Sequence, residues 1–100
     1  MRREKEVRAI VDHYPKMAQV VVLIEEMSEL TKAMTKTMRG KGKKADIVEE
    51  LGDVQLMIYQ MMLMFKVDQK MIDTVIDYKL ERTLKMINEE KQYASNESGV

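Results

Sequence analysis

The sequence contains no cysteine and no tryptophan, and it has only one proline and four glycines among its 100 residues. The lack of cysteine excludes disulfide frameworks, thiolate metal sites and cysteine nucleophiles. With so few residues that interrupt a chain, long helices are favoured over a β fold with many turns. The longest apolar-rich run, Val54 to Phe65, is too short to cross a bilayer. We therefore expect a cytoplasmic protein without membrane contact.

An excess of charge of one sign is also missing. The 17 Lys and Arg residues balance 17 Asp and Glu residues, so the formal net charge is zero. This balance argues against nucleic acid as a partner, because such binders are clearly basic. Hydrophobic residues make up 45% of the chain and charged residues 34%, which indicates a globular rather than a disordered protein. A chain of this length buries only about 60–65% of its unfolded surface, so we expect self-association.

Apolar residues recur at steps of three and four along most of the chain, which is the period of an α-helix. We predict an all-α fold with helices over residues 3–12, 16–38, 46–65 and 68–90. The basic segment 39–44 contains two glycines and marks the clearest break. The third helix is expected to open on a capping box, Asp46-Ile47-Val48-Glu49. We expect one domain over residues 1–92 and a flexible polar tail over residues 93–100.

The two central helices carry the clearest apolar stripes. On the second helix the stripe is centred on Met27 and consists of Val20, Leu23, Ile24, Met27, Leu30, Met34 and Met38. On the third helix it consists of Ile47, Leu51, Val54, Ile58, Met61 and Phe65. The third helix is apolar on other sides too, at Leu56, Tyr59, Met62 and Leu63. Such a band is typical of a subunit interface, which predicts a homo-oligomer, either a dimer or a tetramer.

Two acidic pairs accompany these stripes. At about 100° per residue, Glu26 lies about 100° and Glu29 about 160° to one side of the second stripe's centre. Relative to the centre of the third helix's stripe, Glu50 lies about 40° and Asp53 about 100° away. Glu50 therefore falls within the arc that is expected to be buried, where an unpartnered carboxylate is costly.

Helices joined by a short loop usually pack antiparallel, and the two acidic pairs would then face each other. Four carboxylates in one place repel unless a cation bridges them, and oxygen ligands suit Mg²⁺ or Mn²⁺. The alternative is that these residues belong to solvated helix faces, because exposed acidic residues are common. Glu25 and Glu49 fit that alternative better, as outward residues, as a helix cap or as groups behind the metal ligands.

The two acidic motifs also resemble a known signature. Leu23-Ile-Glu-Glu-Met-Ser-Glu-Leu30 and Ile47-Val-Glu-Glu-Leu-Gly-Asp-Val54 are similar to the EExxE…ExxD motifs of the MazG-like all-α nucleoside triphosphate pyrophosphohydrolases. The likeness extends to His13–Gln19 and Asp77–Arg82, covers about residues 10–90, and is greatest to short bacterial and phage members. It implies an oligomeric, four-helix bundle-like fold. It also implies hydrolysis of (deoxy)nucleoside triphosphates to the monophosphate and pyrophosphate, as in the removal of unwanted nucleotides.

Carried over position by position, the resemblance implies four magnesium ligands, Glu26, Glu29, Glu50 and Asp53. These four are also the expected catalytic residues, together with Glu25, which either points away or is the base that positions water. Lys79 and Arg82 match basic residues of the family's last helix and are expected to bind the substrate phosphates. Gln19 lies on the same flank as Glu26, so it either contacts substrate or is a surface amide.

Substrate choice stays open, because the chain offers only Phe65 and four tyrosines for an aromatic base pocket. Two other functions are also compatible with the sequence. The first is a non-catalytic helical interaction protein whose methionine-rich third helix binds a partner. The second is a hydrolase of the same fold that acts on a specialised nucleotide, such as a histidine-pathway intermediate or a dinucleoside polyphosphate.

Overall fold

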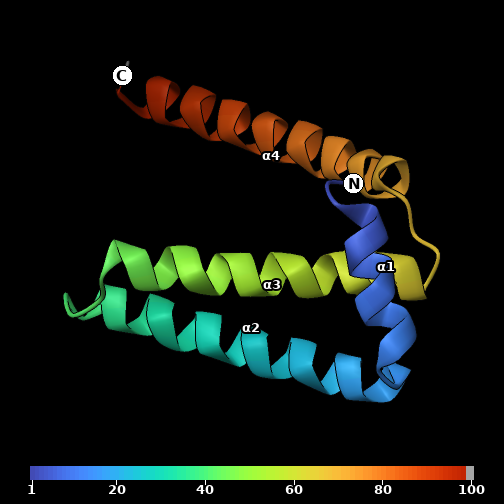
Figure 1. Cartoon of the computed structure of the whole chain (residues 1–100). Helices are drawn as coiled ribbons and strands as arrows, with labels where there is room; N and C mark the ends of the chain where they lie inside the picture. The colour runs from blue at the N-terminus through green and yellow to red at the C-terminus, as the bar shows by residue number, and fades with distance from the viewer. Residues whose placement is uncertain (99–100) are drawn as a thin grey trace. The chain divides into compact units, whose positions relative to one another are not determined.

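A computed structural model of the chain describes residues 1–98, and these form four α-helices and no strand. The helices are α1 (Glu4–His13), α2 (Lys16–Met38), α3 (Lys44–Met64) and α4 (Gln69–Ser98), labelled in Figure 1. The predicted all-α class is confirmed. The chain divides into two compact units, one over residues 1–67 and one from Asp68 onward, and each is described by itself.

The first unit is built on a hairpin in which α2 and α3 run side by side in opposite directions (Figure 1). The loop between them begins with a Schellman motif, in which Gly40 adopts a positive φ of 70°. The Gly40 amide donates to the Thr37 carbonyl at 3.0 Å, and the Lys41 amide donates to the Lys36 carbonyl at 2.9 Å. These bonds satisfy carbonyls at the end of α2. The predicted break between the two helices is confirmed.

The start of α3 differs from the prediction. The helix begins at Lys44 with Lys43 as its N-cap, and no side chain caps it. The expected capping box at Asp46 is therefore wrong, since the Asp46 amide already donates to the Lys43 carbonyl at 3.1 Å. Asp46 lies instead in the first turn, where a negative charge interacts favourably with the helix dipole.

The shortest helix, α1, packs against α3. Val7 is buried, and Ile10 and Val11 are partly buried. Ile10 and Val11 follow Val7 by three and four residues, so the three side chains lie on one side of the helix. The helix begins next to Arg3, whose guanidinium pairs with the Glu6 carboxylate.

The surface where α2 and α3 contact each other, which we call the seam, is narrower than the predicted apolar stripes. Six residues of α2 are not exposed, and all of them except Val20 recur at alternating steps of four and three: Gln19, Val20, Leu23, Glu26, Leu30 and Ala33. Met27, the expected centre of the stripe, is 50% exposed, and Ile24 is exposed as well. The prediction misplaced the centre because α2 is apolar over a wide arc, whereas one partner helix covers only a narrow part of it. Glu26 consequently lies in the seam and not on its shoulder.

On α3 the buried residues are Val54, Met57, Gln60, Met62 and Met64. Val54 was expected in the core, but Leu51, Ile58 and Phe65 of the predicted stripe are exposed. Met62 was expected at a subunit interface and is instead buried within the chain. The buried side of α3 therefore differs from the predicted stripe for the same reason as on α2. Methionines surround the helix, and packing alone selects which of them are covered.

The second unit is a single long helix. The Asp68 carboxylate accepts a hydrogen bond from the Met71 amide at 2.9 Å, which caps the start of α4. The helix continues through Ser98, so the expected end near Glu90 is wrong, and the expected tail is helical up to Ser98. No glycine or proline occurs between Asp68 and Ser98, so nothing in the sequence stops the helix earlier. Residues 99–100 of the predicted tail lie outside the described residues. No helix within residues 1–98 is long and apolar enough to cross a membrane.

Candidate metal centre

Three carboxylates meet across the seam of the hairpin. Glu26 comes from α2, and Glu50 and Asp53 come from successive turns of α3. One oxygen from each lies within 4.8 Å of the others. Glu26 and Glu50 are partly buried and Asp53 is exposed, so the cluster sits at the edge of the seam and faces solvent on one side.

The electrostatics of this cluster are unfavourable as it stands. Burial raises the pKa of Glu26, and the negative charges of Asp53 and Glu29 raise it further. Burial also raises the pKa of Glu50, and the charges of Asp53 and Glu26 add to that effect. None of the ion pairs formed within residues 1–98 involves the three carboxylates of the cluster. The cluster therefore lacks a compensating cation among the described side chains.

Glu50 shows most clearly that the cluster lacks a partner. Its Oε2 is buried and has no hydrogen-bond partner within the described chain. Buried carboxylates are normally paired or coordinate a metal, and each buried polar atom without a partner requires an explanation. A divalent cation with a preference for oxygen ligands fits this donor set, which contains no histidine or sulfur. Mg²⁺, Mn²⁺ and Ca²⁺ are the ions of that kind.

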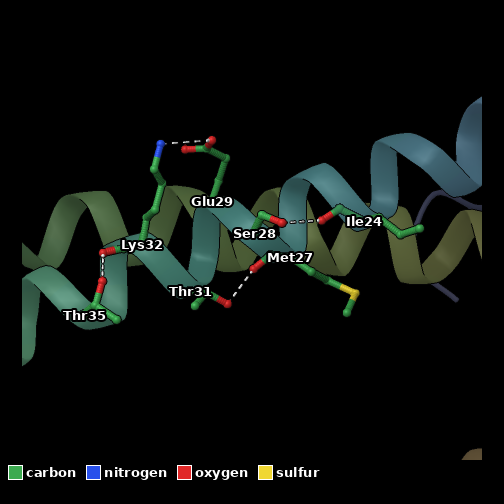
Figure 2. Close-up of polar contacts among 7 residues, drawn as sticks. All are labelled: Ile24, Met27, Ser28, Glu29, Thr31, Lys32 and Thr35. Carbon is green, nitrogen blue, oxygen red and sulfur yellow. Dashed lines mark hydrogen bonds and ion pairs between the residues drawn. The ribbon is translucent and has the colours of Figure 1, made fainter.

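The fourth expected ligand, Glu29, lies outside this cluster. Its side chain is 52% exposed, and its carboxylate pairs with the Lys32 ammonium at 3.8 Å (Figure 2). The seam continues from Glu26 to Leu30, and Glu29 lies about 60° around the helix from Glu26 on the side away from Leu30. Its charge nevertheless contributes to the raised pKa of both Glu26 and Glu50, so it lies within electrostatic reach. Its role as a ligand stays a prediction.

The hydroxyl groups near Glu29 are occupied by the helix itself. As Figure 2 shows, Ser28 donates to the Ile24 carbonyl and Thr31 to the Met27 carbonyl, each at 3.0 Å. Thr35 likewise donates to a carbonyl one turn earlier, at 2.9 Å. None of these three hydroxyls is paired with a base, so this stretch of α2 shows no arrangement for nucleophilic catalysis.

The remaining expected site residues lie elsewhere. Glu25 is exposed, as the helical spacing predicted. Lys79 and Arg82 are exposed residues of α4 and belong to the second unit. Their relation to the carboxylates stays a prediction.

Gln19 has a different environment from either one expected. It is only 3% exposed, so the interpretation as a surface amide is wrong. Its Nε2 donates to the Val11 carbonyl at 3.1 Å and to the Tyr14 carbonyl at 2.9 Å. Its Oε1 accepts from Nε2 of Gln60 at 2.9 Å. Both amide hydrogens of Gln19 are therefore used within the protein, and neither is free for a substrate.

Sequence reasoning missed Gln60, which is 4% exposed. A signal for it was present, because Gln60 interrupts the most apolar run of the chain and follows Asp53 by two helical turns. A polar residue at that spacing faces the same partner helix as the acidic pair.

Comparisons with known proteins add no assignment: no family model matches this chain, and neither a curated protein nor a solved structure matches it. The resemblance to the MazG-like pyrophosphohydrolases thus depends on the motif residues, and the carboxylate cluster is the structural observation that bears on it.

Proposed function

We propose that this protein is a Mg²⁺-dependent nucleoside triphosphate pyrophosphohydrolase of the cytoplasm. It cleaves (deoxy)nucleoside triphosphates between the α and β phosphates and releases the monophosphate and pyrophosphate. The observation that supports this most is the buried, unpartnered Oε2 of Glu50 within a three-carboxylate cluster on two antiparallel helices. The motif that contains these residues resembles that of enzymes with this activity.

In this proposal Glu26, Glu50 and Asp53 hold the ion, and Mn²⁺ can replace Mg²⁺. When bound, the metal supplies charge neutralisation for the phosphates and lowers the pKa of the attacking water. The carboxylates fix its position between the two helices, which suits a reaction that depends on positioning and charge more than on covalent catalysis. Glu29 is the proposed fourth ligand, which requires its carboxylate to leave Lys32. Glu25 is exposed, and we assign it no contact with the ion.

The substrate needs cationic and apolar contacts as well. Lys79 and Arg82 are the proposed partners of the phosphates, because a pyrophosphate leaving group is highly anionic. A cavity of about 220 Å³ beside Tyr14, Val22 and Met57 is the proposed place for the nucleobase. It also borders Gln19, which precedes Glu26 by seven residues, or about 10 Å along a helix. That separation suits a nucleotide that spans from the cavity to the carboxylates.

We also propose a homo-oligomer, either a dimer or a tetramer. The first unit leaves a large amount of apolar surface uncovered. Its exposed large apolar residues on the two long helices include Met17, Val21, Ile24, Met27, Met38, Leu51, Leu56 and Ile58. Pairing such faces across a two-fold axis buries the same surface on both subunits. Sedimentation equilibrium at micromolar concentration tests this, and an active 11.7 kDa monomer would contradict it.

The deciding experiment is a substrate panel. The purified 100-residue chain is incubated with Mg²⁺ or Mn²⁺ and each ribo- and deoxynucleoside triphosphate, together with dinucleoside polyphosphates. Pyrophosphate and monophosphate are measured directly, which establishes the bond that is cleaved. Release of both from at least one triphosphate, lost in Glu50→Gln, supports the proposal. Cleavage of the dinucleotides alone would favour a specialised hydrolase.

The rival function, a non-catalytic interaction protein, makes the opposite prediction. In that case no substrate on the panel is cleaved, and millimolar Mg²⁺ or Mn²⁺ leaves the melting temperature unchanged.

A further inference from the structure

The hydrogen bond between Gln19 and Gln60 joins three helices at one point in the core. Gln60 of α3 donates to Gln19 of α2, and Gln19 donates to two carbonyls at the end of α1. Both side chains are more than nine-tenths buried. The amides thus bond to one another and to the backbone, in surroundings where an unpaired amide is costly.

This amide pair and the carboxylate cluster share one alignment of the two helices. In an antiparallel pair, residues that face each other have a constant sum of residue numbers. That sum is 79 for Gln19 with Gln60, and it is also 79 for Glu26 with Asp53. Two helical turns separate the pairs on both helices, so any slip that breaks the amide bond also moves Glu26 away from Asp53.

The other contacts in this part of the seam specify that alignment weakly. Leu23 and Leu30 flank Glu26 on α2, and Val54 and Met57 continue the seam on α3. Apolar layers of this kind fit several alignments, and methionine adapts to irregular gaps. The carboxylates themselves repel and favour separated helices. A directional bond between buried amides selects one alignment, much as a buried asparagine fixes the register of a coiled coil.

We propose that Gln60 is a positioning residue, whose hydrogen bond to Gln19 holds α2 and α3 in the alignment that brings Glu26 to Glu50 and Asp53. Gln60 would then support the proposed metal centre without being one of its ligands. In this respect the inference rests on the proposed function. It assigns the amide pair to the placement of the carboxylates and not to contact with the substrate.

The absence of cysteine allows this alignment to be measured directly. Spin labels are attached to the full chain through Val21→Cys and Ile58→Cys, two exposed positions between the amide pair and the carboxylate cluster. Both residues belong to the apolar surface that is proposed to pair in an oligomer. The labelled chain is therefore mixed with an excess of unlabelled chain, so that only distances within one chain are recorded. The distance distribution between the labels is recorded by EPR without metal, in the otherwise unchanged chain and in Gln60→Met. The matched control is Gln55→Met, which removes an exposed glutamine of the same helix that donates a hydrogen bond to the Tyr59 hydroxyl.

We expect Gln60→Met to widen or shift the distribution by several ångströms, because one helical turn is about 5.4 Å. Gln55→Met should leave it unchanged. In parallel, Gln60→Met should weaken Mn²⁺ binding about tenfold, at a temperature where circular dichroism shows the variant fully folded. A purely structural role would lower the melting temperature without changing either quantity in the folded chain, and that result would overturn the inference.

Failure of the proposed function gives a different pattern. If the unsubstituted chain binds no Mn²⁺, the metal centre is wrong, whereas the spin-label distances still show whether Gln60 sets the alignment. If Gln60→Met does not fold, Gln60→Asn is measured in the same labelled chain, because it keeps an amide that is too short to reach Gln19. A distribution identical to that of the unsubstituted chain in the folded variant would overturn the inference.

Discussion

Two polar layers lie two turns apart in the seam between α2 and α3, and they differ in how their polar atoms are satisfied. In the amide layer, Gln19 and Gln60 are almost fully buried, and hydrogen bonds join them to one another and to α1. In the carboxylate layer, negative charges gather and Glu50 has a buried oxygen without a partner. The satisfied layer stabilises the fold, whereas the crowded charges of the unsatisfied layer lower its stability. The carboxylate layer is therefore the one where we propose that a metal ion binds, and the amide layer is its proposed support.

The largest effect should follow from removing a charge in the carboxylate layer. We expect Glu50→Gln and Glu26→Gln to abolish pyrophosphate release, because each removes a proposed metal ligand. The metal-free fold should be as stable or more stable, because repulsion is relieved. Pyrophosphate release and thermal unfolding check the two halves of this prediction. Glu25→Gln is the control and should be milder; near-normal activity in either ligand variant would refute the assignment.

In the amide layer we expect a substitution to lower the stability of the fold. Gln19→Leu leaves the Val11 and Tyr14 carbonyls without their side-chain donor and removes the acceptor for Gln60. We expect the free energy of unfolding to fall by about 2–4 kcal/mol, which chemical denaturation would measure. Gln55→Leu, at an exposed position, should change it by less than about 0.5 kcal/mol. Equal effects of the two substitutions would show that the buried amides contribute little.

Metal addition should make the two layers alike, because it gives the carboxylates a partner. At a concentration 100 times the dissociation constant, Mg²⁺ or Mn²⁺ should add about 2.7 kcal/mol to the stability of the folded chain. Differential scanning calorimetry measures this as a rise in melting temperature that EDTA reverses. The Glu50→Gln variant should show a much smaller rise, and an equal rise there would place the ion elsewhere.

The pH dependence of stability tests the carboxylate layer without metal. The pKa values of Glu26 and Glu50 are raised above the ordinary 4.5, so above that value the folded chain holds more protons than the unfolded chain. Stability should therefore fall as the pH rises through this window. We expect the metal-free chain to melt at a higher temperature near about pH 5 than near about pH 7.

One variant isolates the origin of that slope. Glu26→Gln should flatten it, because one of the two raised groups is gone. Glu6 does not interfere with this measurement. Its hydrogen bond and pairing with Arg3 lower its pKa, so it changes stability only at pH values below the ordinary pKa of 4.5. A slope of the opposite sign in the metal-free chain would mean that the carboxylates are not crowded in solution.

The smallest effect on stability is expected at Glu29. The motif makes this residue a metal ligand, whereas the structure places it outside the carboxylate cluster. Glu29→Gln removes an exposed ion pair with Lys32, so the change in stability should stay below about 1 kcal/mol. Mn²⁺ affinity distinguishes the two possible roles of Glu29. A loss as large as that of Glu26→Gln would show that Glu29 joins the ligands when the ion binds, and a small loss would leave it as a neighbouring charge.

Much of this protein could be predicted from its residues taken one helix at a time. The spacing of apolar residues predicted four helices, and the bounds of α2 were correct at both ends, Lys16 and Met38. The helical angle of Glu50 correctly predicted a carboxylate within the contact surface. The cap of α3 and the end of α4 were missed, because helix ends depend on competing local hydrogen bonds and breakers and not on periodicity.

What only the tertiary structure decided is which residues meet. The sequence by itself determined that α2 and α3 are amphipathic and acidic on one flank, because spacing along a helix is a local property. It left a wide apolar arc on each helix, and the position of the partner within that arc depends on packing between segments far apart in the chain. Packing placed Glu26 in the seam and turned Glu29 outward. It also paired Gln19 with Gln60, because these two amides meet only once α3 packs against α2.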